Sequence, residues 1–156
     1  MPVTSVTKDP EALTLTLVAD FPVPQSRLWA AWADPRQLER FWGPPFAPAT
    51  FTHHDFRVGG RAEYFLTGPG GEKWSGAWKF TAVNPIDSFA ADDGEDGAED
   101  GDLPMSMTFA FEATPSGSRM VSVTRFSSVE AMERTTPGME EGLRAAMPQL
   151  DEVLAG

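Results

Sequence analysis

The chain contains no cysteine, which excludes disulfide bonds, a thiol nucleophile and a thiolate metal site. It also has little positive charge, with 12 Lys and Arg against 23 Asp and Glu, and its formal net charge is −11. Binding to phosphates needs clustered basic side chains, so a nucleic-acid partner is not expected. No apolar run approaches the roughly 20 residues of a membrane span, and the N-terminal segment lacks the pattern of a secretory signal. We therefore expect no membrane span and a cytoplasmic location.

Histidine is scarce, and this limits the catalytic chemistry available. His53 and His54 are the only two histidines, and neighbours on a strand point to opposite faces, which disfavours a shared metal ion. His54 could enter an interior cavity and act as an acid or base near neutral pH, but an ordinary strand histidine is the favoured interpretation. No Ser-His-acid set, phosphate loop or His-Glu metal motif is present. The sequence therefore predicts no catalytic residue, no metal site and no cofactor.

Acidic residues gather in one segment, 92–102, with the sequence DDGEDGAEDGD. Its spacing does not match the ligand positions of a calcium-binding loop. A solvated connection between two strands is therefore preferred to a metal site.

The length of 156 residues is that of one domain, 1–156, with a core predicted over about 12–155. Apolar and polar residues alternate from Ala12 to Phe21, as in a strand with one buried face. Residues 25–42 predict two short helices, with Ser26 as a cap of the first, Asp34 capping the second and Pro35 at its first position. Glycine and proline turns then separate six predicted strands: 51–57, 61–67, 73–83, 86–91, a strand over Met105–Phe111, and 119–126.

The last part of the chain predicts a long helix. Met139, Leu143, Met147, Leu150 and Leu154 recur at helical spacing and form one apolar stripe. Upstream, Ser127 to Glu130 fits a capping box that begins a short helix. We expect this short helix to end near residues 135–138, with Thr136 capping the long helix, Pro137 at its first position and Pro148 kinking it. The predicted fold is α+β: about seven antiparallel strands curve around the C-terminal helix, and two short helices lie between the first and second strands.

This order of elements resembles the helix-grip fold of the START-like superfamily. Shorter motifs narrow the resemblance: Phe21–Pro24, Leu28–Trp32, Asp34-Pro35, Phe41–Pro44, Asp55–Gly60, Gly76, Phe126–Ser128 and Gly138–Gly142. They are similar to one branch, named for the activator of heat-shock-protein-ninety ATPase, whose C-terminal domain the chain resembles from about Leu13 to Leu154. The resemblance implies an apolar or amphipathic small molecule bound between the sheet and the last helix. Leu143 departs from the branch, where tryptophan is common at this position.

The inner face of the predicted sheet can be assigned from the alternation. Trp78, Phe109 and Phe126 should face the terminal helix, and Tyr64 should do so by analogy with the branch. Trp42 lies where a cavity mouth would be. The predicted ligand-binding residues are Trp42, Tyr64, Trp78, Phe109, Phe126, Met139, Leu143 and Met147. Aromatic and methionine side chains suit an adaptable apolar pocket, but a packed core needs a similar set, so a filled core remains the alternative.

Function follows from this cavity as an expectation. We predict a protein that binds an apolar small molecule there. One alternative is an enzyme of the cyclase or dehydratase type, for which His54 and Tyr64 are the only titratable candidates. The other is a protein-interaction module like the co-chaperone domain. A homodimer is compatible with exposed sheet edges, although no sequence pattern indicates one.

Overall fold

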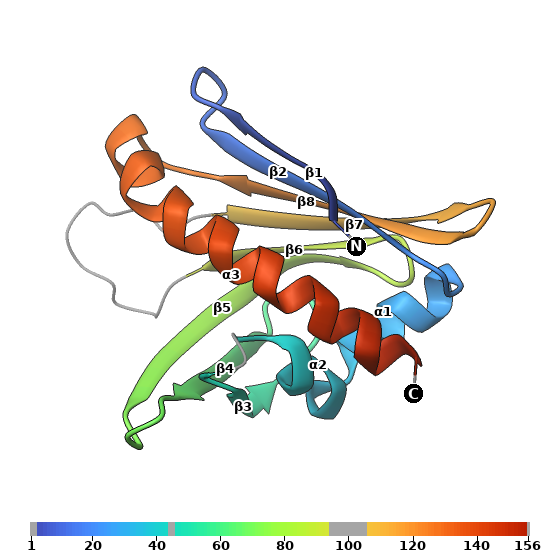
Figure 1. Ribbon diagram of the computed structural model, residues 1–156, viewed down its shortest axis with the longest axis horizontal. Helices are drawn as coiled ribbons and strands as arrows, with labels where there is room; N and C mark the ends of the chain where they lie inside the picture. Colours follow the sequence, from blue (N-terminus) through green and yellow to red (C-terminus); the bar gives the residue numbers. More distant parts are fainter. Residues whose placement is uncertain (1–2, 44–45, 94–105, 156) are drawn as a thin grey trace.

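The computed structural model describes residues 3–43, 46–93 and 106–155. In this part of the chain, one antiparallel sheet with the strand order β1-β2-β8-β7-β6-β5-β4-β3 curves around a long C-terminal helix, α3 (Figure 1). Most of the predicted acidic connection, residues 94–102, lies outside the described residues. No helix in the described ranges is both long enough and apolar enough to cross a bilayer.

Two short helices, α1 and α2, connect β2 near one edge of the sheet to β3 at the other edge. Their residue ranges and those of the other elements are β1 Val3–Asp9, β2 Thr14–Phe21, α1 Gln25–Ala33, α2 Pro35–Phe41, β3 Ala49–His54, β4 Arg61–Thr67, β5 Lys73–Asn84, β6 Ser88–Asp93, β7 Ser106–Thr114, β8 Gly117–Arg125 and α3 Val129–Ala155. This arrangement confirms the predicted α+β helix-grip fold. The described strands number eight rather than about seven, so the two helices lie between the second and third strands.

β1 is the strand that the sequence analysis missed. It pairs with β2 at one edge of the sheet, and its register shifts between Val3 and Ser5. Because a bulge inserts one extra residue, Val3 and Val6 both pack against the core although they are three positions apart. The apolar spacing therefore lacks the period of two by which a strand is recognised.

The corner between α1 and α2 forms as predicted at Asp34. The Asp34 carboxylate accepts a hydrogen bond from the backbone N–H of Arg36 at 2.9 Å, and Pro35 is the first residue of α2. The prediction of Ser26 as a cap is wrong, because α1 begins at Gln25 after Pro24 and has no side-chain cap. The short helices are instead held by packing, with Leu28, Trp32 and Leu38 at most 1 % exposed.

α3 is one continuous helix, which corrects the predicted break near residues 135–138. It runs through Pro137 and Pro148, and the Thr136 hydroxyl donates to the carbonyl of Met132 at 2.6 Å instead of capping a new helix. The cap of the first turn is also displaced, since Ser128 rather than Ser127 accepts from the N–H of Ala131. Met132, in the first half of the helix, is fully buried. Its tertiary packing outweighs the helix-breaking tendency of Pro137.

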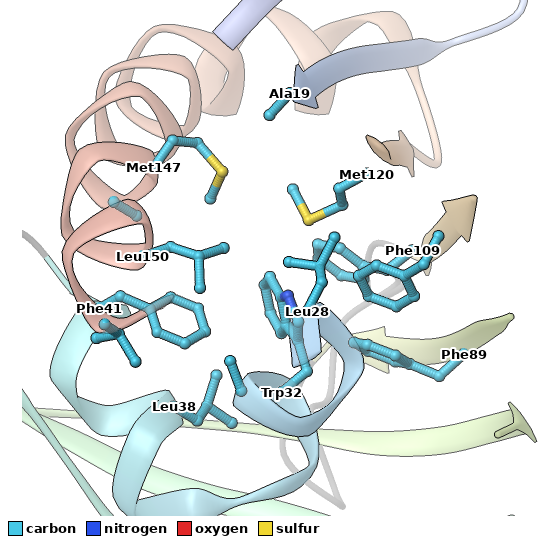
Figure 2. Close-up of a cluster of buried hydrophobic side chains, with 14 of the residues drawn as sticks. Ala19, Leu28, Trp32, Leu38, Phe41, Phe89, Phe109, Met120, Met147 and Leu150 are labelled. Atoms are coloured by element: carbon cyan, nitrogen blue, oxygen red, sulfur yellow. The ribbon is translucent and has the colours of Figure 1, made fainter. Parts of the chain in front are cut away.

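The core is filled at both ends of α3. Toward its C-terminus, Met147 and Leu150 point toward Met120, Leu28 and Trp32, and these side chains form one buried cluster (Figure 2). Toward its N-terminus, Met132 packs in a second, smaller cluster. The middle of α3, between the two clusters, covers the cavity described next.

Candidate ligand cavity

A cavity of about 240 Å³ lies between the middle of α3 and the concave face of the sheet. The helix contributes Met139, Gly142, Leu143 and Ala146 to its lining. The sheet and the segment after α2 contribute the remaining lining residues: Trp42, Gly43, Tyr64, Leu66, Trp78, Met107, Phe109, Ser122 and Thr124. No charged side chain is among the described residues that line it.

The lining divides into a buried floor and a half-exposed mouth. We define the floor by its buried residues, which are Trp78, Met107, Phe109, Ser122, Thr124 and Ala146. The mouth consists of partly exposed residues, which are Trp42, Gly43, Tyr64, Leu66, Met139, Gly142 and Leu143. A molecule that entered at the mouth would therefore pass from a partly exposed apolar surface to a buried interior.

Three aromatic rings form one wall of the cavity. The ring centroids of Trp42 and Trp78 lie 5.0 Å apart with planes inclined by 62°. Tyr64 meets Trp42 edge-on at 6.0 Å and Trp78 at 5.5 Å. Rings in such tilted and edge-to-face contacts stabilise one another beyond the area that they bury. The wall is thus a rigid aromatic corner rather than a set of loose side chains.

Gly76 decides where the Tyr64 ring lies. The two residues are paired across β4 and β5, and a Cβ added at Gly76 would come within 2.4 Å of the Tyr64 ring and hydroxyl. The ring therefore lies directly over the backbone of β5, and any side chain at position 76 would displace it. Gly142 of α3 differs from Gly76, because a Cβ there would meet no atom within 4 Å and would stand in open space.

The segment after α2 is fixed at the mouth by backbone contacts. Trp42 is the C-cap of α2, and its N–H donates to the carbonyl of Leu38 at 2.9 Å. Gly43 follows with φ of +94°, a conformation that favours glycine. Its carbonyl accepts a hydrogen bond from the Gln149 side chain at 2.8 Å, so the mouth is attached directly to α3.

Six of the eight predicted ligand-binding residues line this cavity: Trp42, Tyr64, Trp78, Phe109, Met139 and Leu143. The other two do not. Phe126 packs with Leu15 and Met132 in the smaller cluster, and Met147 belongs to the main core, where it points toward Met120 (Figure 2). Both are on inward faces, as predicted, but they lie in the filled zones that flank the cavity.

His54 lies outside the cavity. Its ring stacks on Phe56 at 5.5 Å and meets Phe80 edge-on. Burial is the largest influence on the pKa of His54 and lowers it. The backbone of Trp32 and Ala33 and the charge of Asp34 act in the opposite direction, but the net shift of the pKa is downward. Neither ring nitrogen has a well-aligned hydrogen-bond partner among the described residues. Tyr64 is consequently the one titratable side chain in the described lining.

The sequence analysis missed Ser122 and Thr124 on the floor. Both lie on the inward face of β8 and are 2 % exposed. The signal that could have found them is the polarity of this strand: Ser118, Ser122 and Thr124 occupy core-facing positions, while Val121 and Val123 face outward. Buried polar side chains in a core strand are more informative than apolar ones.

A curved antiparallel sheet that holds a long C-terminal helix over a cavity defines the helix-grip class of proteins. The chain belongs to the family described as activator of Hsp90 ATPase homolog 1-like protein, whose model matches residues 22–155.

Solved structures agree with this assignment. A protein from Arthrobacter aurescens is 46% identical with a TM-score of 0.90, over 98% of this chain and 92% of that one. Protein Ms6760 from Mycobacterium smegmatis is 42% identical with a TM-score of 0.88, over 99% and 98%. An AHSA1-like protein from Aeromonas hydrophila shares the fold at 16% identity and a TM-score of 0.73, over 91% and 92%. The comparison with curated proteins found no match.

Proposed function

We propose that this protein binds an apolar or amphipathic small molecule in the cavity beneath α3. The observation that carries the proposal is an apolar cavity of about 240 Å³ with a buried floor and a half-exposed mouth. Packed protein interiors contain few voids larger than one water molecule. At a liquid volume of about 30 Å³ per water, this cavity has room for about eight waters.

The residues around the cavity support binding rather than a packing defect. Gly142 lines the cavity and a Cβ there would stand in open space, so filling this position would reduce the cavity. Gly76 has a different role, since it leaves room for the Tyr64 ring. Leu143 lines the mouth at a position where a larger side chain would project into the same space. The wall of three rings offers flat apolar surface, which is typical of small-molecule sites.

The two alternative functions have less support. An enzyme of the cyclase or dehydratase type would have to use Tyr64, because His54 lies outside the cavity lining. The support for a protein-interaction module is the family description, which names an activator of a chaperone ATPase, whereas the cavity is a feature of this chain's own structure. A cytoplasmic location and a homodimer remain predictions.

Native mass spectrometry of the protein as purified from cells tests the proposal. We expect the wild-type protein to carry an additional small-molecule mass that is lost under denaturing conditions. Leu143→Trp should remove this mass because the larger ring occupies the mouth. Arg144→Trp is the matched control, since it places the same ring on the exposed side of α3 and should leave the mass unchanged.

Two results would contradict the proposal. A ligand retained equally by Leu143→Trp would lie elsewhere on the protein. A wild-type protein that carries no ligand, and takes up none from a hydrophobic metabolite extract, would indicate that the cavity has no binding role.

A further inference from the structure

The floor of the cavity carries two hydroxyl groups, on Ser122 and Thr124, that border the cavity itself. Ser122 and Thr124 are each 2 % exposed, and no hydrogen bond joins either side chain to another residue in the described part of the chain. A hydroxyl that faced this cavity with no partner at all would cost about 1–3 kcal/mol. Both hydroxyls are therefore available to a hydrogen-bonding atom inside the cavity, from water or from a ligand that displaces it.

The neighbouring strands cannot supply such an atom. Ser122 is paired with Phe109 on β7 and with Leu17 on β2. Thr124 is paired with Met107 and Leu15 in the same way. All four cross-strand neighbours have side chains without a hydroxyl, amide or charge. The cavity is thus the side from which a hydrogen-bonding atom can approach.

The remainder of the lining restricts the ligand further. A carboxylate or ammonium group would lose its hydration without meeting an opposite charge, because no charged side chain lines the described cavity. The volume of about 240 Å³ is below the roughly 300–1,000 Å³ of ordinary ligand sites, which excludes a long acyl chain lying wholly inside. The rings of Trp42, Tyr64 and Trp78 are suited to a flat partner.

We infer that the ligand is an uncharged, compact aromatic molecule bearing a hydroxyl or carbonyl group, and that this group hydrogen-bonds to Ser122 and Thr124 on the floor. The aromatic part lies against the wall of Trp42, Tyr64 and Trp78. The inference rests on the proposed function and specifies the chemistry of the same site.

Calorimetric titration with three probes tests it: naphthalene, 2-naphthol and 2-naphthoate, which share one ring system. We expect the double variant Ser122→Ala/Thr124→Val to bind 2-naphthol about tenfold more weakly than the wild type does, because each hydrogen bond contributes about 0.5–1.5 kcal/mol. Its affinity for naphthalene should be unchanged. Ser106→Ala/Thr108→Val is the matched control, since it makes the same substitutions on the outward face of β7 and should change neither affinity. The carboxylate probe should bind the wild type at least about tenfold more weakly than 2-naphthol.

The outcomes separate this inference from the proposed function. If Ser122→Ala/Thr124→Val lowers the affinities for naphthalene and 2-naphthol equally, or lowers neither, the two hydroxyls do not recognise the ligand although the cavity binds it. If 2-naphthoate binds as well as 2-naphthol, the ligand need not be uncharged. If no probe binds the wild type, a compact aromatic molecule is not the ligand, and this inference fails while the proposed function stands on its own test. If Leu143→Trp binds all three probes as well as the wild type does, the probes bind outside the cavity and the cavity function itself fails.

Discussion

His54 shows how burial changes the role of a single side chain. As a histidine in a predicted inward strand it was a candidate acid or base, but its ring lies among Phe51, Phe56 and Phe80. Its position follows from a register shift between Phe51 and His53, which brings Phe51 and His54 to the same face of β3. The result is a histidine in a packed aromatic cluster, and its effect is on stability rather than on chemistry in the cavity.

This placement predicts a pH-dependent stability. Burial lowers the folded-state pKa of His54 below the unfolded value of about 6.5, so the unfolded state binds the proton more readily. The free energy of unfolding should therefore fall as the pH drops through about 6.5, until the folded-state pKa is passed. Urea denaturation at about pH 7.5 and about pH 5.5, where carboxylates stay ionised, measures this loss.

The variant His54→Phe should show a smaller loss of stability between the two pH values, because the replacing ring cannot be protonated. His53→Gln is the control, since His53 is exposed, and it should keep the wild-type dependence. An equal loss of stability in His54→Phe and in the wild type would show that other groups cause it.

At the scale of elements, α3 shows where local signals mislead. Pro137 within an amphipathic pattern predicts a helix boundary, and the capping box from Ser127 to Glu130 predicts a separate short helix before it. The helix is continuous because both of its halves bury apolar side chains, Met132 in one cluster and Met147 with Leu150 in the other. Packing on both sides of the proline outweighs the loss of one backbone hydrogen bond.

The beginning of α3 carries a prediction that separates two adjacent serines. Ser128→Ala should lower the free energy of unfolding by about 1 kcal/mol, because it removes the acceptor for the Ala131 N–H. Ser127→Ala, the cap expected from the sequence, should change it by less than about 0.5 kcal/mol. Urea denaturation of both variants measures the difference, and a larger effect from Ser127→Ala would reverse the assignment.

At the scale of the whole molecule, two packed clusters and the cavity between them form a single layer beneath α3. Val6 of β1 packs against both clusters, so the edge strand connects the two ends of the layer. The aromatic wall, the hydroxyl floor and the middle of the helix belong to this same layer, in which the sheet contributes lining residues from β4, β5, β7 and β8.

This connection makes Val6 a sensitive position despite its place on an edge strand. Val6→Ala should lower the free energy of unfolding by about 1 kcal/mol, since each buried methylene contributes about 0.8 kcal/mol and Val6 is only partly buried. Ser5→Ala, at the exposed neighbouring position, should change it by less than about 0.5 kcal/mol. Equal denaturation midpoints for Val6→Ala and the wild type would mean that β1 does not support the core.

The sequence alone determined the class of fold, because the class depends on local patterns. Alternation located β2 and β4 to β8 to within a few residues, Asp34-Pro35 located the corner between the helices, and helical spacing located the second half of α3. The same patterns assigned the inward faces of Trp78, Phe109 and Leu143. These features need only the periods of strands and helices and the chemistry of caps and turns.

Tertiary structure alone decided the rest, because each remaining feature depends on contacts between distant residues. Bulges in β1 and β3 altered the face on which Val6 and His54 lie. Whether an inward side chain fills the core, as Phe126 and Met147 do, or borders the cavity, as Trp42 and Tyr64 do, depends on where α3 crosses the sheet. The period of a strand predicts which side chains point inward, but the packing of the other elements determines whether such a side chain meets a filled core or an open cavity.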